Sequence, residues 1–296
     1  MNKKRWGIGA IALLIALAGG GFLYFKTLNQ SVPAAEYTIS RLIRYGCAVE
    51  NTTNRLAQNV RLSLRAPVKQ TATQRCDALD ANLPFERTVD DLGNQVLVFT
   101  IDRLPPYATR LVTVSARLMM AAQPGAIGVS PGPDTRQPAP FIESDNTELT
   151  AISRKLVAGS ISATARKASD WVSGNLKPAG YTKNARGAIF ALKAGTGDCT
   201  EYMYLFTALC RGAGIPARGV AGYVSDRDAV IGPERYHNWA LFFDGTLWQI
   251  ADPFNRVFTA DQSNYIAMRL FGPEPAPFER FHIEGPEGVI ARMAAL

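Results

Sequence analysis

The sequence predicts an α+β protein with an N-terminal membrane helix, a small antiparallel β-sandwich and a second domain that mixes helices with strands. Three observations lead to this prediction: an uncharged apolar segment near the start, strand-like alternation over residues 36–122, and helix-like periodicity from residue 146 onward. The chain has 296 residues, of which 47% are hydrophobic, so it can bury a core and form about two domains. This composition excludes a disordered chain.

The N-terminal segment predicts a signal anchor over residues 1–30. Three cations at positions 3–5 precede an uncharged stretch from Trp6 to Phe25. About 20 helical residues, at ~1.5 Å each, span a bilayer core of ~30 Å. Cations on this side of the stretch favour a cytoplasmic N-terminus, so we expect a single-pass protein of the inner (plasma) membrane whose bulk lies outside the cytoplasm, in the periplasm or beyond. The alternative is a cleaved signal peptide with Ala16-Leu17-Ala18 as cleavage site, which would release a secreted protein.

The net charge indicates little about partners. It is +7 overall, and four of the cations, Lys3, Lys4, Arg5 and Lys26, flank the apolar segment. The remainder is only slightly basic, so we expect no nucleic-acid partner. The oligomeric state is left open by the sequence.

Residues 36–122 read as the β-sandwich domain. The segment VRLSLRA alternates apolar and polar residues, and further short strands follow with turn residues between them. Cys47 and Cys76 lie in this region and are expected to form a disulfide in an oxidising compartment. Such a bond would stabilise the domain by roughly 3–4 kcal/mol in the chain-entropy model. The alternative is two unpaired buried thiols.

A stretch rich in proline and glycine, residues 123–145, is expected to be a linker. The helical pattern then begins, with Asp145 as the expected cap, and the mixed domain is assigned to residues 146–272. The tail, residues 273–296, has no assigned structure.

The segment GDCTEYMYLF places a cysteine at the start of a helix. Asp198 and Glu201 have the spacing of a capping box, which makes Cys199 the first helical residue. Unpaired backbone N–H groups and the helix dipole favour a thiolate there, although the two acids oppose it, so a histidine partner is needed. A lone cysteine in an apolar helix is more often a core residue, and Cys210 fits that description.

The segment YHNWALFFDGTLWQIADP predicts a hairpin that brings His237 to Asp252. A two-residue turn at Asp244-Gly245 pairs these two residues on one face, with Cβ atoms about 5 Å apart. A chance surface pair is the alternative. Only two histidines are present, and the sequence around the second, His282, does not predict a comparable catalytic pairing. With no CxxC pair either, we expect no metal site and no cofactor.

Four motifs in order resemble the transglutaminase-like superfamily, whose core is papain-like. They are Gly197-Asp198-Cys199, Gly214-Ile215-Pro216-Ala217-Arg218, His237-Asn238-Trp239 and Asp252-Pro253. The resemblance runs from about Thr147 to Pro253, a little over a third of the chain. It implies Cys199 as nucleophile, His237 as base and acid, and Asp252 as the residue that orients the imidazole.

The resemblance implies a thiol enzyme that cleaves an amide bond in a peptide or protein through a thioester. Tyr236 and Trp239, beside the histidine, are expected to contact the substrate. The second oxyanion donor is not evident, and the segment YTKNAR from Tyr181 to Arg186 is a candidate. Two alternatives remain at this stage: an amide transferase of the transglutaminase type that uses the same triad, and a non-catalytic envelope scaffold.

Overall fold

The computed structural model describes residues 33–127, 131–182, 184–273 and 279–294. The expected signal anchor over residues 1–30 lies outside the described residues. Within the described ranges, no helix is both long and apolar enough to cross a membrane. Ala34–Leu296 forms one compact unit. Because this unit is not divided further, the expected boundaries between sandwich, linker and mixed domain stay predictions.

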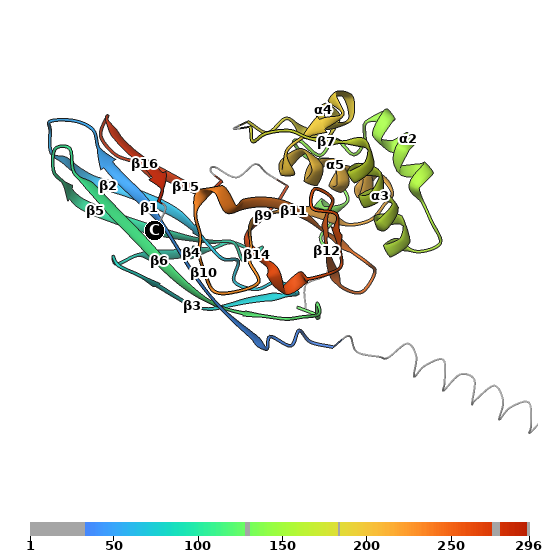
Figure 1. Ribbon diagram of the computed structural model, residues 1–296, viewed down its shortest axis with the longest axis horizontal. Helices are drawn as coiled ribbons and strands as arrows, with labels where there is room; N and C mark the ends of the chain where they lie inside the picture. Colours follow the sequence, from blue (N-terminus) through green and yellow to red (C-terminus); the bar gives the residue numbers. More distant parts are fainter. Residues whose placement is uncertain (1–32, 128–130, 183, 274–278, 295–296) are drawn as a thin grey trace, which may run out of the picture. The chain divides into compact units, whose positions relative to one another are not determined.

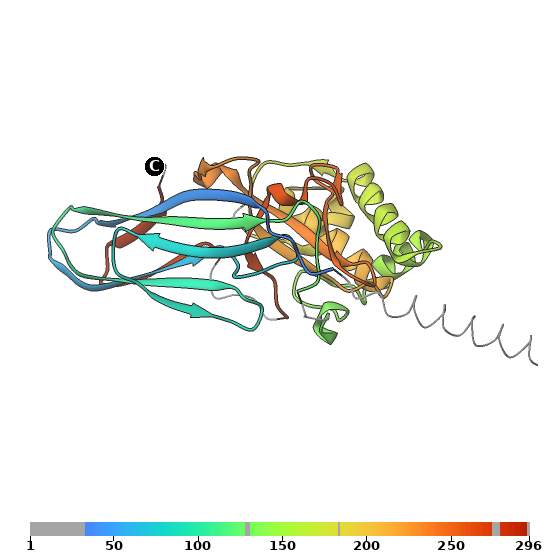
Figure 2. The ribbon, with the colours of Figure 1, turned by 90° about the horizontal axis from the view of Figure 1, so that it is seen from below.

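Two sheets form the sandwich (Figure 1), and all their strand pairs are antiparallel except that of β1 with the short β10, which is parallel. Their inner faces bury alternate residues such as Val60, Leu62 and Leu64, as the period-two pattern requires. In the first sheet, β1 and β6 run antiparallel side by side (Figure 2). Its members are β3 (Gln74–Ala81), β6 (Thr109–Met120) and β1 (Ile39–Asn51), with β10 (Ala229–Val230) and β16 (Val289–Met293) on the free side of β1. The second sheet consists of β15 (Phe281–Glu284), β2 (Ala57–Ala66), β5 (Gln95–Leu104) and β4 (Glu86–Val89).

The C-terminal tail, to which the sequence assigns no structure, supplies one strand to each sheet. Strand β15 pairs with β2, Phe281 opposite Leu64, and β16 pairs with β1, Cys47 opposite Met293. The sandwich is therefore completed by the two ends of the described chain, which lie on either side of the mixed domain in the sequence.

The predicted disulfide between Cys47 and Cys76 is wrong, because both thiols are free. Strand β6 separates the two cysteines: Cys47 lies opposite Val112 and Cys76 opposite Leu118. Six residues along one strand correspond to roughly 20 Å, whereas a disulfide needs Cα atoms within about 7 Å. Cys47 belongs to the sandwich core and Cys76 packs against it partly buried, and burial raises the pKa of Cys47 to about 12 and of Cys76 to about 11.

The mixed domain packs helices against a five-stranded sheet (Figure 1). Helix α5 is the central helix: it is almost entirely buried and packs against β9 and β11. The helices are α2 (Thr147–Leu156), α3 (Ile161–Asn175), α4 (Gly187–Ala194) and α5 (Cys199–Gly212). The sheet order is β13 (Val257–Phe258), β12 (Trp248–Asp252), β11 (Tyr236–Phe243), β9 (Ala217–Val224) and β14 (Tyr265–Leu270).

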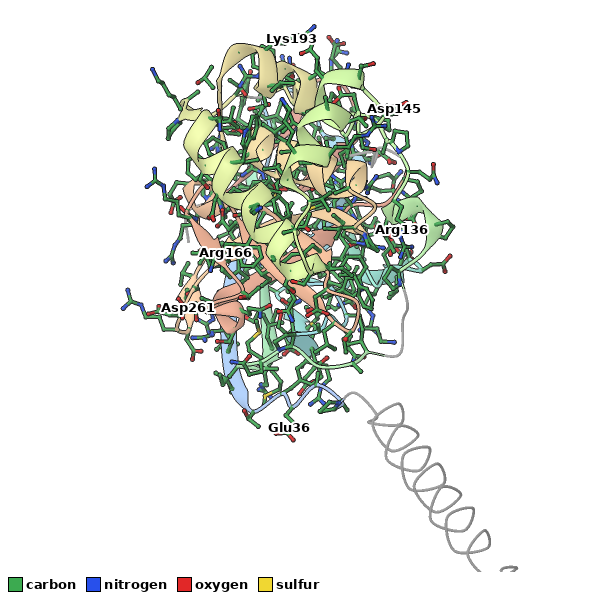
Figure 3. All side chains as sticks on the ribbon, turned by 90° about the vertical axis from the view of Figure 1, so that its right-hand side faces the viewer. Glu36, Arg136, Asp145, Arg166, Lys193 and Asp261 are labelled. Atoms are coloured by element: carbon green, nitrogen blue, oxygen red, sulfur yellow. The ribbon has the colours of Figure 1, made fainter. Side chains whose placement is uncertain are left out.

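The outer faces of the helices are polar, as Figure 3 shows for Arg166 of α3 and Lys193 of α4, and Asp145 in the turn before α2 is exposed as well. Asp145 is not the cap of α2, contrary to the sequence-based expectation. Its neighbour Asn146 takes that place and accepts hydrogen bonds from the N–H groups of Glu148 and Leu149. Either side chain can cap a helix, so spacing alone did not separate them.

Candidate active site

Polar groups fix the start of helix α5. The Asp198 carboxylate accepts a hydrogen bond from the Thr200 N–H at 2.8 Å, and the Asp198 N–H donates to Glu201 Oε2 at 3.1 Å. This is the predicted capping box. Glu201 is fully buried and forms an ion pair with Arg186 at 2.8 Å. Cys199 is therefore held as the first helical residue at a well-defined position.

Cys199 is half-buried and lines a cleft of about 740 Å³. His237 and Asn238 of β11 line the same cleft, together with Phe254 and Asn255 from the turn after β12. A hydrogen bond joins the Cys199 side chain to the His237 imidazole. The backbone N–H of Cys199 donates no hydrogen bond within the described part of the chain, so it is available to a ligand.

His237 Nε2 lies 2.7 Å from Asp252 Oδ2, and both side chains are largely shielded from solvent. The predicted hairpin register is wrong by two residues. Phe243 pairs with Trp248, so the loop has four residues, held by the Asp244 carboxylate, which accepts from the N–H groups of Thr246 and Leu247. A shift of two residues keeps each side chain on its own face, so Asp252 becomes the diagonal neighbour of His237 and still reaches it.

Two further residues contact the Asp252 carboxylate, and sequence reasoning missed both. The Tyr265 hydroxyl donates to Oδ2 at 2.9 Å from the edge strand β14. Asn255 donates to Oδ2 through its side chain at 2.8 Å and to Oδ1 through its backbone N–H at 3.2 Å. Asn255 follows the Asp252-Pro253 turn and could have been found as a turn residue, whereas no local pattern points to Tyr265.

These contacts set the charges of the pair. Burial alone would lower the pKa of His237, but the hydrogen bonds and charges of Asp252 and Cys199 outweigh it and raise the pKa to about 9. Burial would raise the pKa of Asp252, and the His237 contact together with the Asn255 hydrogen bonds lowers it below its ordinary value. The pair therefore favours an imidazolium beside a carboxylate at neutral pH.

The cleft walls come from distant segments. On one side lie Tyr181 and Thr182, and the Thr182 N–H donates to Asp198 Oδ2 at 3.0 Å, which ties this segment to the start of α5. Tyr236 also lines the cleft, and its contact with a substrate stays a prediction. Trp239 is placed elsewhere: it is 1% exposed and lies under the imidazole, with ring centroids 6.2 Å apart. Trp239 therefore packs against the imidazole from the protein interior and does not line the cleft.

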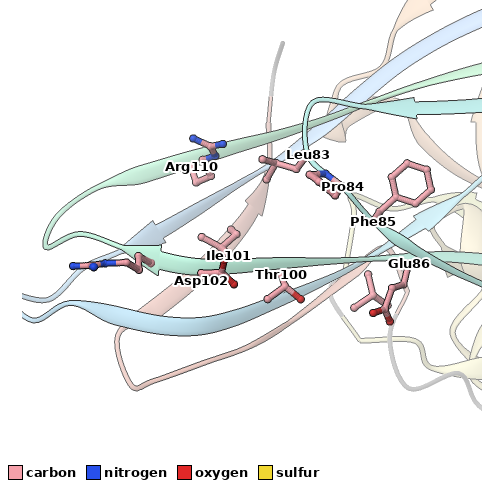
Figure 4. A pocket seen from close by; sticks show the side chains of 10 residues that line it. Leu83, Pro84, Phe85, Glu86, Thr100, Ile101, Asp102 and Arg110 are labelled. Atoms are coloured by element: carbon pink, nitrogen blue, oxygen red, sulfur yellow. The ribbon is translucent and has the colours of Figure 1, made fainter.

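A second cavity, of about 620 Å³, lies in the sandwich between β5 and the connection that leads to β4 (Figure 4). Leu83, Phe85 and Thr100 line it, with no cysteine or histidine. The cleft at Cys199 is therefore the better candidate for a reactive site. Among the described residues, no cluster of three or more histidine, cysteine or acidic side chains could hold a metal ion.

Comparisons with known proteins point to the same region. The family model of the transglutaminase-like superfamily matches residues 151–253. No curated protein sequence matches the chain.

Several solved structures are similar to the chain. A candidate cysteine protease from Cytophaga hutchinsonii is 15% identical with a TM-score of 0.57, over 87% of this chain and 94% of that one. The periplasmic domain of TgpA from Pseudomonas aeruginosa is 15% identical with a TM-score of 0.38, over 78% of this chain and 93% of that one. Red sea bream transglutaminase is 11% identical with a TM-score of 0.29, over 72% of this chain and 47% of that one.

The Cytophaga hutchinsonii protein shares the fold over nearly its whole length, and at this identity the likeness shows the fold alone. The family match covers the segment that runs from α2 through α5 and β11 to the end of β12. Residues 151–253 of this chain therefore form a domain of the transglutaminase-like superfamily.

Proposed function

We propose that the protein is a cysteine hydrolase that cleaves an amide bond in a peptide or protein. One observation carries this proposal: Cys199 and His237 line one cleft in hydrogen-bonding contact, and Asp252 holds the far side of the imidazole at 2.7 Å. A nucleophile, a base and a residue that orients the base are the groups that acyl transfer through a thiol requires.

In the proposed reaction, the Cys199 thiolate attacks the amide carbonyl carbon, and a negative charge develops on the carbonyl oxygen. The free N–H of Cys199 is in place as one donor to that oxygen, and the Tyr181–Arg186 segment stays the candidate for a second. The C–N bond then breaks as His237 gives its proton to the leaving amine. A water molecule loses a proton to His237 and attacks the thioester, which releases the acid and restores the thiolate.

The raised pKa of His237 supports this assignment of roles. An imidazole with a pKa of about 9 is protonated at neutral pH, so it can stabilise a neighbouring thiolate and also act as the acid for the leaving amine. Asp252, whose pKa is lowered, supplies the charge that maintains the imidazolium.

The N-terminal segment extends the proposal to location. Its uncharged stretch and the cations before it support an anchored protein whose cleft faces the space outside the cytoplasm. Protease protection of the chain in spheroplasts and in inverted membrane vesicles tests this part separately from the chemistry.

Substrate profiling by mass spectrometry tests the chemistry. A glutamine-containing peptide library is incubated with the purified protein, with and without an added primary amine, and Cys199→Ala serves as the control. Chain cleavage or loss of ammonia that requires Cys199 supports hydrolysis. A product that carries the amine supports the transferase instead. If iodoacetamide labels Cys199 near pH 6 no faster than an ordinary thiol, and neither product forms, a non-catalytic scaffold is the better description.

A further inference from the structure

A smaller cavity lies at the other end of the catalytic sheet, where strand β9 begins. It has a volume of about 200 Å³ and is lined by Arg218, Trp248 and Leu241 of the sheet and by Lys69 and Thr71 from the loop after β2. Leu241 of β11 lies opposite Arg218 of β9. On β11, Leu241 comes four residues after His237. This cavity is therefore roughly 13 Å from the imidazole along the strand and separate from the cleft.

The Arg218 side chain in this cavity lacks the partners that a buried guanidinium normally has. Only 7% of the residue is exposed, and its Nε is buried without a hydrogen-bond partner. Within the described ranges, none of its guanidinium nitrogens donates a hydrogen bond, and no carboxylate oxygen lies within 4.0 Å of them. Its guanidinium lies over the Trp248 ring, with Cζ 5.0 Å from the ring centroid.

A second buried cation increases the imbalance. Arg211, at the end of helix α5, is 5% exposed and donates from Nε to the Ala217 carbonyl at 2.9 Å. Burial, together with repulsion from Arg218, lowers the pKa of Arg211 to about 10. Asp134 is the carboxylate whose charge opposes this effect at both arginines. Two buried cations thus share one carboxylate that is too distant from Arg218 to form an ion pair.

An unpaired buried charge costs several kcal/mol, so such charges in proteins are normally paired. The apolar walls of Trp248, Leu241 and Leu270 suit a hydrophobic body, and the planar guanidinium at its side suits a carboxylate. We propose that this cavity binds a small organic anion, a carboxylate on a compact apolar body, with Arg218 as the residue that takes its charge. Lys69 and Asp91 line the cavity as well, so the charge of a ligand affects how well it binds there.

Binding of benzoate, compared with its neutral analogue benzamide and with inorganic phosphate, tests the proposal on the purified protein without any activity assay. Benzoate is expected to raise Tm by about 3 °C or more at ten times its Kd, while benzamide has little effect. Arg218→Met is expected to reduce benzoate affinity at least tenfold and, because it removes an unpaired charge, to leave the ligand-free Tm unchanged or higher. Arg41→Met is the matched control, since Arg41 is also buried, at 5% exposed, but does not line the cavity.

The result can fail in distinguishable ways. If benzoate produces no saturable shift, or the same shift in Arg218→Met as in the unmodified protein, the proposed site is overturned. If phosphate binds and benzoate does not, the apolar part of the proposal is wrong. Arg218→Lys keeps the charge and loses the planar fork, so it should also weaken benzoate binding, and it provides the test if Arg218→Met does not fold. None of these outcomes depends on whether Cys199 is a nucleophile.

Discussion

The two ends of helix α5 each carry a cysteine beside charged residues, in opposite settings. At its N-terminal end, Cys199 faces a cleft and contacts His237, and the surrounding acids all have partners. At its C-terminal end, Cys210 is 1% exposed in the core, and Arg211 shares one distant carboxylate with Arg218. Burial alone raises the pKa of the Cys210 thiol, which keeps it protonated.

The place of a thiol on the helix decides which chemistry is open to it. Position N1 provides free N–H groups, access to a cleft and a partner from another strand, whereas a position on the last turn provides only packing. Charges are balanced at the end of α5 where we propose chemistry and unbalanced at the end where we propose a ligand.

Replacing each cysteine of α5 by alanine separates the roles of the two thiols directly. Cys199→Ala should reduce kcat/KM for the amide substrate by about 10³-fold or more, because it removes the atom that forms the thioester. Cys210→Ala should leave kcat/KM within about twofold and lower the free energy of unfolding by about 1 kcal/mol through lost packing. Steady-state kinetics and urea unfolding of both variants measure this. Equal losses of activity in the two variants would contradict the proposed role of Cys199.

Replacement of Asp252 tests whether the N-terminal end depends on its charge partner. Asp252→Asn keeps the shape but cannot hold an imidazolium, so we expect kcat/KM to fall by at least about 10²-fold, towards the ~10⁴-fold loss of kcat that follows neutralisation of a triad carboxylate. The rate of Cys199 alkylation by iodoacetamide near pH 6 should fall as well. Circular dichroism of the variant checks that the fold is retained. Unchanged kinetics would mean that Asp252 serves only to stabilise the hairpin.

The sequence was sufficient for the parts of this site that depend on local patterns. Asp198 and Glu201 form the expected capping box, and His237 and Asp252 meet although the loop length was wrong, because a shift of two residues preserves the face of a strand. The predicted disulfide was wrong because the positions of two cysteines in a strand-rich segment do not determine which strand lies between them in the sheet. Here that strand is β6, which keeps Cys47 and Cys76 apart.

Long-range pairing was the part that local patterns could not supply. The tail joins the sandwich only because β15 and β16 find β2 and β1, more than 200 residues away in sequence. Tyr265 reaches Asp252 from β14, which lies beyond β9 at the edge of the sheet. A residue whose function depends on sheet order carries no local signal, because its neighbours are set by the fold and not by its spacing.

The pH dependence of stability tests the charge state of His237. Its pKa in the folded protein, about 9, lies above the ordinary value of 6.5, so the native state holds a proton that the unfolded state releases. The stabilisation is complete below about pH 6.5 and is lost as pH rises through 9, and it amounts to roughly 3 kcal/mol at most. Urea unfolding between pH 6 and 10 measures this fall. His237→Gln should remove most of the slope, while Arg218→Met should leave it in place.

A smaller loss is expected at Tyr265, which donates a hydrogen bond to Asp252 and packs edge-on against the Trp239 ring, with centroids 5.1 Å apart. Tyr265→Phe removes one hydrogen bond to a buried carboxylate, worth about 1.5 kcal/mol, so kcat/KM should fall about tenfold. The acid limb of the pH–rate profile should move to higher pH, because the carboxylate loses a donor that favours its charged form. Tyr202→Phe is the matched control: Tyr202 on α5 is also buried and donates to the Leu176 carbonyl at 2.7 Å, so it should lose stability without moving the profile. If both variants shift the profile equally, Tyr265 contributes to packing alone and does not position Asp252.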